Sequence, residues 1–389
     1  MSEGRLKIMF ISFWYPNRVK PLLGIFVKRH AAALTKVADV SALYVCADEK
    51  AGIEESNEED IYTIRVYYKR VKHNIPLFST GHKVWRYLRA WRKALRLYKL
   101  KKGKPDIVHS NIVYPVSLIA AYLKFKWKVP YIITEHWTGY LPADGRYKGN
   151  AMKFFSRIAV KYASAVTVVS EHLKKMMLEA KLDSIYYVVS NVVDTNLFKS
   201  SGKHDETGGT INFLHVSSLD DKQKNITGII RTFTRVISDF PQARLTIIGP
   251  KRESEELQNL CQELNIKDSV CFSDYVMNEE LVRVLNSAHA FVLFSNYETQ
   301  AVVLLESICC GVPVITTKME AIAEYVNPKN GILVDAGNEQ QLYNAMVNMI
   351  KNANTYKPVE VRSTIVEKVN PEAVAQQFLN VYRNVLKFS

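Results

Sequence analysis

Cysteine is scarce in this sequence, and the cysteines that occur are not spaced for a shared structural role. There are five among 389 residues, with no CxxC pair and no cysteine–histidine spacing of the kind that binds zinc. A disulfide framework and a structural zinc site are therefore not expected. We expect buried free thiols at Cys46, Cys261, Cys271, Cys309 and Cys310.

Long apolar runs are also lacking. No run approaches the roughly 20 residues that span a bilayer. The first residues lead directly into a strand-like segment at residues 6–13, without the layout of a signal peptide. These absences favour a cytoplasmic location.

The composition is that of a folded protein. Hydrophobic residues make up 48% of the chain and charged residues 23%, far from the composition of disordered chains. At 389 residues the chain is roughly two to three times the size of an ordinary domain. We therefore predict two domains, each with its own core.

Positive charge is concentrated in the first half of the chain. Residues 1–200 contain 34 Lys and Arg against 16 Asp and Glu, whereas the remainder contains 18 against 22. The whole net charge of +14 therefore comes from the first half. An excess of this kind indicates an anionic partner for the first domain.

Residues 81–104 hold ten Lys or Arg and no acid. An amphipathic helix is predicted here, with an apolar stripe at Val84, Leu88, Trp91 and Leu95. The stripe either packs on its own domain or lies on a membrane surface, with the cations on anionic headgroups. Nucleic acid is the least favoured partner, because no nucleic-acid-binding motif accompanies the charge.

Short apolar runs of β-forming residues alternate with helical patterns along the chain. This alternation predicts an α/β fold of two Rossmann-like, doubly wound domains, whose strand carboxyl ends face a central cleft. The expected domains are residues 1–200 and 201–370, joined near residues 195–210, with a C-terminal helix at 371–389 packing on the first domain. The expected strands are residues 8–13, 41–45, 107–109, 131–134, 165–169, 186–189, 211–216, 244–248, 270–272, 290–294 and 314–316, and the expected helices are 25–34, 114–123, 171–179, 226–238, 253–264, 279–286 and 302–309.

Two glutamates follow the apolar strand that ends at Phe294. Glu298 lies in the turn after this strand, and Glu306 lies about two turns into the next helix. Glu306 stands between apolar residues, where an unpaired charge is costly. We expect the amides of residues 299–301 to lie at the N-terminus of that helix and to form an anion site there.

Around these residues the chain resembles the large family of retaining GT-B glycosyltransferases usually numbered four. Its hallmark is two Glu separated by seven residues, followed by a small-residue helix and Gly-x-Pro-Val, which here are Glu298, Glu306 and Gly311-Val-Pro-Val. Other segments resemble family motifs in the expected order, from about residue 8 to residue 335, and this order makes the resemblance specific. They include Asp106–His109, Thr134–His136, Val169–Glu171, Ser190–Phe198, Ile248–Pro250, Ala321–Glu324 and Asn330–Val334.

The resemblance implies a role for several residues. Glu306 should bind the ribose hydroxyls of a nucleotide-sugar, and Glu298 should bind hydroxyls of the donor sugar. Lys224 matches the lysine that binds the diphosphate, where a cation stabilises the leaving phosphate. Lys222 is a weaker candidate two residues away.

The chain departs from the family at two places. Ser218 stands where the family has an arginine, which removes one charge from the diphosphate site. Thr299, Gln300 and Ala301 replace a usual Gly-Phe-Gly, so that side chains are expected where the donor sugar should lie.

In the first domain the loop containing Gly24 resembles the family's glycine loop near the diphosphate and acceptor, although a lone glycine is also typical of an ordinary turn. His136 follows an apolar strand and resembles the active-site histidine, with a structural histidine as the alternative. His109 and His215 are expected at similar strand ends with less support.

No metal is expected. The family resembled does not use a bound divalent cation, and the adjacent Asp220 and Asp221 are better interpreted as a solvated turn. Cys309 and Cys310 are interpreted as small residues that pack in the helix after Glu306. No cofactor is predicted other than the nucleotide-sugar itself.

The resemblance thus implies an enzyme that transfers a sugar from a nucleoside-diphosphate donor to a hydroxyl with retention of configuration. A lipid-linked or envelope glycan is the favoured acceptor, at a cytoplasmic site that includes the inner membrane face, and a small soluble acceptor is the alternative. A dinucleotide dehydrogenase is disfavoured because no GxGxxG follows an early strand. A second alternative is a decayed, non-catalytic protein that binds carbohydrate or membrane. The only feature that favours it is Ser218, which stands in place of the family's arginine.

Overall fold

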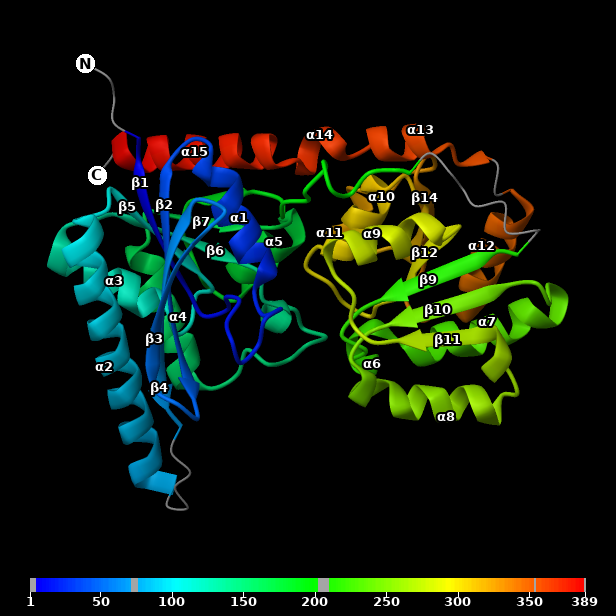
Figure 1. Ribbon diagram of the computed structural model, residues 1–389, viewed down its shortest axis with the longest axis horizontal. Coiled ribbons are helices and arrows are strands. Elements are labelled where there is room, and N and C mark those ends of the chain that lie inside the picture. Colours follow the sequence, from blue (N-terminus) through cyan, green and yellow to red (C-terminus); the bar gives the residue numbers. More distant parts are fainter. Residues whose placement is uncertain (1–4, 71–75, 202–209, 353–354, 388–389) are drawn as a thin grey trace. The chain divides into compact units, whose positions relative to one another are not determined.

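The computed structural model describes residues 5–70, 76–201, 210–352 and 355–387, and it divides into two compact units (Figure 1). The first unit comprises Met1–Tyr140, Arg146–Val192 and Pro371–Ser389, and the second comprises Leu141–Gly145 and Val193–Asn370. The C-terminal segment thus belongs to the first unit. Residues 202–209 of the expected linker lie outside the described residues.

The first unit is built on an eight-stranded sheet with the order β3-β4-β2-β1-β5-β6-β7-β8. All neighbouring strands are parallel except β3 and β4, which form an antiparallel pair at one edge. The strands are β1 (Lys7–Ser12), β2 (Asp39–Asp48), β3 (Gly52–Glu58), β4 (Ile61–Lys69), β5 (Ile107–Asn111), β6 (Tyr131–Glu135), β7 (Ala165–Val168) and β8 (Tyr186–Val188).

Helices cover this sheet because its central strands are apolar on both faces. The C-terminal helix packs on α1, and together they bury Phe378, Tyr382 and Leu34 in one core cluster (Figure 1). The helices are α1 (Ile25–Thr35), α2 (Pro76–Lys102), α3 (Ser117–Trp127), α4 (Asn150–Tyr162), α5 (Glu171–Glu179) and α15 (Pro371–Lys387), with a 3-10 turn at Thr138–Tyr140.

The long basic helix α2 packs on β2 and β4 over only part of its length. Trp91 and Leu95 of the expected apolar stripe are buried, whereas Val84 and Leu88 are 52% and 49% exposed. Trp85 is 54% exposed on the same half of the helix. The prediction that the stripe packs on its own domain is therefore confirmed for Trp91 and Leu95, whereas Val84 and Leu88 are exposed to solvent and the membrane interpretation stays a prediction.

The second unit contains a six-stranded, fully parallel sheet with the order β11-β10-β9-β12-β13-β14. The strands are β9 (Asn212–Val216), β10 (Arg244–Ile248), β11 (Val270–Ser273), β12 (Ala290–Leu293), β13 (Val314–Thr317) and β14 (Gly331–Val334). The helices are α6 (Asp221–Lys224), α7 (Ile226–Asp239), α8 (Glu255–Glu263), α9 (Asn278–Ser287), α10 (Val302–Cys309), α11 (Glu320–Ala323), α12 (Glu339–Lys351), α13 (Pro358–Ser363) and α14 (Val366–Val369), with 3-10 turns at Lys251–Ser254 and Lys267–Ser269.

Both sheets are doubly wound, as the alternating pattern predicted. Successive strands run outward from β1 in one direction and from β5 in the other, and the same reversal occurs between β9 and β12. Loops that leave two such neighbouring strands diverge and leave a crevice at the strand carboxyl ends. The switch points β1/β5 and β9/β12 are therefore the places where doubly wound sheets typically bind their ligands.

The cysteines follow the sequence expectation in part. Cys261, Cys309 and Cys310 are buried free thiols, as predicted. Burial raises the pKa of Cys309 to about 12, which suits a packing role in α10 and not a nucleophilic one. The expectation is wrong for Cys271, which is exposed on the edge strand β11, and Cys46 is only half-buried.

Candidate active site

A lysine and a glutamate meet at the switch point of the second unit. The ammonium of Lys224, at the end of α6 after β9, donates a hydrogen bond to Oε1 of Glu298, in the loop after β12. Their side chains are only 14% and 5% exposed. The structure thus brings together two of the residues singled out by sequence, at the place where a parallel sheet binds its ligand.

Local capping interactions fix the position of Lys224. Asp221 accepts hydrogen bonds from the backbone N–H and the hydroxyl of Thr227, both at 2.8 Å. Asn225 adopts a left-handed conformation between α6 and α7, and its side-chain oxygen accepts from Gly228 N at 3.2 Å. Asp221 is therefore a capping residue of this turn, in agreement with the interpretation of Asp220 and Asp221 as a turn.

The loop after β12 is tied to α6 by several hydrogen bonds. Asn296 donates from its backbone to Gln223 O at 2.7 Å and from its side chain to Lys222 O at 2.9 Å. The side chain of Gln223 in turn donates to Tyr297 O at 3.3 Å. Because these bonds join the two loops on either side of the switch point, Lys224 and Glu298 are held in a fixed relation.

Glu298 has further partners besides Lys224. The hydroxyl of Ser295 donates to Glu298 Oε1 at 3.0 Å, and the amide of Gln223 donates to Oε2 at 3.4 Å. Carboxylate oxygens accept several hydrogen bonds each. Glu298 is therefore chemically suited to bind hydroxyl groups in addition to these donors.

The loop after β9 requires close backbone contacts. A Cβ on Gly249, just after β10, would lie 2.5 Å from Ser217 O and from Leu219 Cγ. Ser217 accepts from Leu219 N at 3.0 Å and is bonded to the ring of His215 at 2.8 Å. Ser218 is exposed in this loop.

His215 is the penultimate residue of β9, near the strand's carboxyl end as expected. Its other ring nitrogen is bonded to Val292 O of β12 at 2.8 Å. Burial, with the positive charge of Lys224 adding to it, lowers the pKa of His215 to about 4. His215 is therefore neutral at pH 7 and fastens the two strands that flank the switch point.

The segment 299–301 differs from its expected arrangement. The helix α10 begins at Val302, so that Thr299 and Gln300 precede it and Ala301 is its N-cap residue, with φ 59°. The side-chain amide of Gln300 is buried and donates to the hydroxyl of Tyr325 at 2.7 Å. The side chain of Gln300 therefore points into the core of the second unit, and the expectation that it lies at the donor-sugar position stays a prediction.

Glu306 lies in α10 as predicted and is buried, 2% exposed, between the buried Leu305 and Ile308. Its backbone carbonyl accepts from Cys310 N at 3.0 Å and so helps to end the helix. A carboxylate in such surroundings needs polar partners, because burial of an unpaired charge is costly.

Gly24 and His136 belong to the first unit. Gly24 is the N-cap residue of α1 with φ 69°, and a Cβ there would lie 2.3 Å from Trp14 O. Glycine is therefore required by both conformation and space. The ring of Phe26, two residues later, lies 4.5 Å from the ring of His136 between centroids.

His136 is buried and is oriented by its neighbour Glu135. Oε1 of Glu135 accepts from His136 N at 2.7 Å and Trp137 N at 2.8 Å, and Oε2 accepts from Val113 N at 2.8 Å. Burial raises the pKa of Glu135 to about 7, although these backbone donors oppose the rise. Burial holds the pKa of His136 well below its usual value, and the nearby His30 adds to this, so the ring is neutral at pH 7.

His109 has a structural role in the middle of β5. One ring nitrogen is bonded to the hydroxyl of Tyr382 in α15 at 2.6 Å, and the other is bonded to Thr134 at 2.5 Å. The residue is completely buried, and burial lowers its pKa well below the usual value. The expectation of a strand-end position is therefore wrong for this histidine.

Within the described parts of the chain, no group of three or more His, Cys, Asp or Glu side chains is arranged to hold a metal ion. Within the same residues, no helix is both long enough and apolar enough to cross a bilayer.

Comparison with known proteins assigns the two units to families. Residues 198–363 match the family described as Glycosyl transferases group 1, and residues 24–197 match Glycosyltransferase Family 4. The chain is a glycosyltransferase with the GT-B fold. The two matches meet at residues 197 and 198, a few residues after the passage between the structural units.

Individual relatives support the same assignment. The chain is 24% identical to a putative teichuronic acid biosynthesis glycosyltransferase, TuaC, of Bacillus subtilis over 94% of each protein. Sucrose-phosphate synthase from Thermosynechococcus elongatus shares the fold with a TM-score of 0.82 and 18% identity, over 98% of this chain and 100% of that one. Anabaena HepE in complex with UDP has a TM-score of 0.75 and 16% identity, over 97% of this chain and 100% of its own.

Sequence reasoning missed two residues of this glycosyltransferase. Gln223 lies next to the expected lysine, and only the folded loop shows that its amide reaches Glu298. Asn111 ends β5 at the switch point of the first unit and is completely buried. Its carboxamide nitrogen and oxygen have no hydrogen-bond partner within the described residues. A polar residue at the end of an apolar strand was the available signal for Asn111.

Proposed function

We propose that this glycosyltransferase transfers a sugar from a nucleoside-diphosphate donor to a hydroxyl with retention of configuration. The observation that carries the proposal is the pairing of Lys224 with Glu298 at the β9/β12 switch point, with Glu306 buried in the helix that follows. A cation for the diphosphate and carboxylates for hydroxyl groups are the chemistry that such a donor needs. HepE, which shares the fold, was solved with UDP.

We assign the groups as follows. Lys224 stabilises the charge that grows on the diphosphate as the bond between the anomeric carbon and the phosphate oxygen breaks. Glu298 accepts hydrogen bonds from the donor sugar, and Glu306 accepts them from the ribose. The new bond forms between the acceptor oxygen and the anomeric carbon, and the acceptor proton leaves with the diphosphate or to solvent.

His136 and Gly24 contribute from the first unit in this proposal. The neutral ring of His136 lies against Phe26, and Glu135 holds the backbone beside it. We assign this ring one hydrogen bond to the reacting sugar. We assign the loop of Gly24 a position near the diphosphate, and glycine is needed in this loop because a side chain there would clash with the backbone of Trp14. We propose no metal ion and no other cofactor for the reaction.

The remaining members of the donor site are Ser218, Thr299, Gln300 and Ala301. Ser218 is exposed in the loop after β9 and is free to approach the phosphates, although it brings no charge. Thr299 and Ala301 offer backbone groups before α10, while Gln300 acts indirectly by fixing this loop to Tyr325.

For the acceptor we propose a lipid-linked or envelope glycan, with the enzyme at the cytoplasmic face of the membrane. The exposed first half of α2 supports this, because it combines apolar side chains with cations. TuaC, the Bacillus relative, is named for teichuronic acid biosynthesis. A small soluble acceptor remains the second candidate, since sucrose-phosphate synthase shares the fold.

A panel of UDP-, GDP- and ADP-sugars tests the proposal. The correct donor should raise the melting temperature of the protein and should yield a glycosylated product with the configuration of the donor. A protein that no nucleotide-sugar stabilises would instead be the decayed binding protein that Ser218 favours. Inversion at the anomeric carbon would contradict the retaining assignment alone.

A further inference from the structure

A large apolar pocket lies beside α2 in the first unit. Its volume is about 730 Å³, and its walls come from the loop after β1, from β2, from α2 and from the start of α3. Aromatic and aliphatic side chains dominate the lining, among them Trp14, Leu23, Tyr44, Tyr87, Leu118 and Phe155. A pocket of this size and lining is suited to an aliphatic chain.

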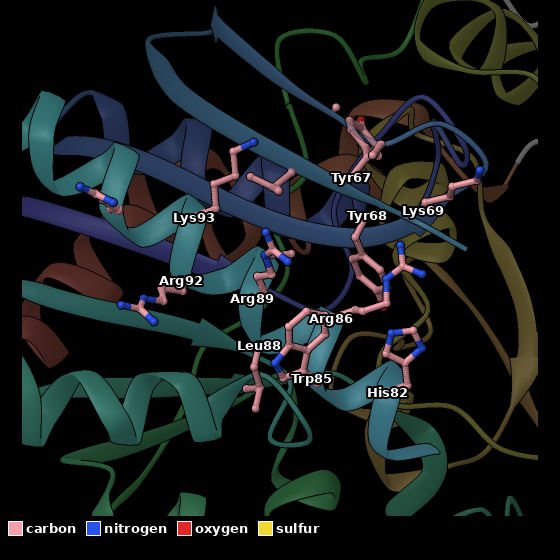
Figure 2. Close-up of a pocket in the computed structure, with 15 residues that line it drawn as sticks. Tyr67, Tyr68, Lys69, His82, Trp85, Arg86, Leu88, Arg89, Arg92 and Lys93 are labelled. Carbon is pink, nitrogen blue, oxygen red and sulfur yellow. The ribbon is translucent and has the colours of Figure 1, made fainter. Parts of the chain in front are cut away.

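A second hollow lies on the neighbouring side of α2, and we refer to it as the basic groove. It has a volume of about 890 Å³ and is lined by Lys69 and by five cations of α2, with no acid among its lining residues. Figure 2 shows Arg86 of α2 beside Tyr68 of β4, with Arg89 and Lys93 further along α2. The five cations of α2 that line the basic groove are Arg86, Arg89, Arg92, Lys93 and Arg96.

The charges of the basic groove are not neutralised by the protein itself. In the described residues, ion pairs of α2 with carboxylates involve only Lys101 and Lys102, near the end of the helix. Arg89 lies over the ring of Trp85, 5.3 Å from its centroid. A cluster of uncompensated cations on one wall creates a positive potential that attracts an anion.

The apolar pocket and the basic groove meet at Tyr68 and Leu88, which line both. Arg86 lines the groove on one side of this boundary, and Arg70 lines the pocket on the other. Burial raises the pKa of Tyr68, and the positive charges of Arg86 and Arg70 oppose the rise. Both guanidinium groups therefore act on the same hydroxyl at the junction.

We propose that the first unit binds a single molecule of a phosphate-bearing lipid, with the phosphate at the junction of Arg70, Tyr68 and Arg86 and the aliphatic chain in the apolar pocket. Charge complementarity fixes the anionic end, and the apolar lining fixes the orientation of the chain. The site differs from a membrane-surface contact, because the aliphatic chain of one lipid molecule leaves the bilayer and enters the protein. The inference rests on the proposed transferase function in one respect, namely that the bound lipid is the acceptor.

Decyl phosphate below its micellar concentration is a suitable probe, with inorganic phosphate and decanol as its two halves. Trp14 lines the pocket and Trp85 lines the groove, so intrinsic tryptophan fluorescence reports binding. We expect saturable binding of decyl phosphate at least about ten-fold tighter than that of either half, because one molecule joins two favourable contacts. Binding no tighter than that of inorganic phosphate would overturn the proposal.

A first pair of matched variants tests where the aliphatic chain of the lipid binds. Val84→Glu puts a carboxylate at the edge of the apolar pocket, and Leu100→Glu adds the same charge to α2 outside it. Both residues are exposed, so neither change should prevent folding. We expect Val84→Glu to weaken decyl phosphate binding about ten-fold or more and Leu100→Glu to leave it unchanged. Equal effects of the two changes on affinity would overturn the proposal that the aliphatic chain lies in the apolar pocket.

A second pair of variants locates the phosphate. Arg70→Gln with Arg86→Gln removes two cations at the junction, and Lys126→Gln with Lys128→Gln removes two exposed cations elsewhere in the first unit. Only the first pair should reduce the affinity for decyl phosphate, and neither pair should alter that for decanol. Loss of affinity in both pairs alike would overturn the junction site in favour of a diffuse charge effect.

Donor-dependent melting shifts, recorded on the same samples, separate this inference from the proposed function. A protein that a nucleotide-sugar stabilises but that does not bind decyl phosphate overturns the lipid site and leaves the transferase function standing. A protein that binds decyl phosphate saturably but responds to no nucleotide-sugar supports the lipid site and overturns the transferase function.

Discussion

The ammonium of Lys224 donates to the carboxylate of Glu298, a residue 74 positions further along the chain. The contact crosses the β9/β12 switch point, and it places opposite charges where the loops of the two strands diverge. Because both side chains are largely buried, each charge is stabilised by the other. A diphosphate that binds here must share the three donors of the lysine with Glu298.

Removal of either proposed nucleotide contact should weaken donor binding. Lys224→Ala removes the cation assigned to the diphosphate, and Glu306→Ala removes the acceptor assigned to the ribose. Each change should weaken nucleotide binding by about 1 to 3 kcal/mol, the range for a lost charge-assisted hydrogen bond. Titration calorimetry with the nucleoside diphosphate of the active donor measures the effect.

Glu298→Gln is the control for these two variants. It removes a negative charge from beside Lys224 and keeps a hydrogen-bond acceptor, so nucleotide affinity should not fall although turnover should. Unchanged nucleotide affinity in both alanine variants, with melting temperatures that show intact folding, would mean that the nucleotide binds elsewhere.

The backbone at Ala301 predicts a stabilising substitution. This residue has φ 59° and ψ 79°, and a left-handed conformation costs an L-residue about 1 to 2 kcal/mol. Ala301→Gly should therefore raise the free energy of unfolding by about 1 kcal/mol. Urea denaturation measures it, with Ala32→Gly within α1 as the matched change, which should cost about 1 kcal/mol. A loss of stability in Ala301→Gly would show that the methyl group contributes more than the strain.

Most of the central strands and several helices could be predicted from the sequence. The helices α5 and α10 and the strand β10 have the predicted bounds, because each is a periodic or apolar run between clear turn signals. The antiparallel pair of β3 and β4 was missed. Strand β3 is a run of mostly polar residues that are exposed or half-buried, and it is extended because it pairs with β4 at the sheet edge.

The helix α4 was missed for a different reason. Its buried residues are Ser156, Ala159 and Val160, and two small residues with one β-branched residue form a weak apolar stripe. The apolar stripe of α2 was recognised, but its partial exposure depends on where β2 and β4 end alongside it. The exposed fraction of a helix is set by tertiary contacts, and the residue pattern of one segment does not contain it.

In the candidate site, too, the residues could be predicted from the sequence but their contacts could not. Resemblance to a family indicated Lys224 and Glu298 separately, whereas their contact depends on the hydrogen bonds that tie α6 to the loop after β12. The inward direction of Gln300 depends on Tyr325, which comes from a later segment. A single sequence contains no signal for partners that are so far apart along the chain.

His136 should affect turnover more than nucleotide binding. If its ring contacts the reacting sugar, His136→Ala should reduce kcat by at least about ten-fold while the affinity for the free nucleoside diphosphate changes little, the pattern of an interaction made in the transition state. His136→Gln keeps a hydrogen-bond donor and should recover part of the loss. Turnover equal to that of the unmodified enzyme in His136→Ala would assign the residue a structural role only.

The second unit should lose stability in acid through His215. Its pKa is about 4 in the folded protein and about 6.5 in an unfolded chain, so the unfolded state binds more protons between these values. Stability should therefore fall as the pH drops from about 6.5 to about 4, by roughly 3 kcal/mol for this group. Urea midpoints at several pH values measure it. His215→Asn should be less stable at pH 7 and should show a smaller loss in acid; an unchanged pH dependence would mean that other groups dominate.

The exposed apolar side chains in the first half of α2, together with exposed cations further along the helix, should attach the enzyme to anionic membranes. Cations near such a surface contribute about 1 kcal/mol each, so the change of four cations to glutamine should cost about 4 kcal/mol of vesicle binding. Co-sedimentation should require anionic lipid and should weaken as salt rises, because salt screens exposed charges. The four cations are Arg89, Arg92, Lys93 and Arg96, and the matched control changes the exposed Lys126, Lys128, Lys148 and Lys181. If neutral and anionic vesicles bind equally, or if both quadruple variants lose binding alike, α2 is not the membrane contact and the acceptor should be sought among soluble molecules.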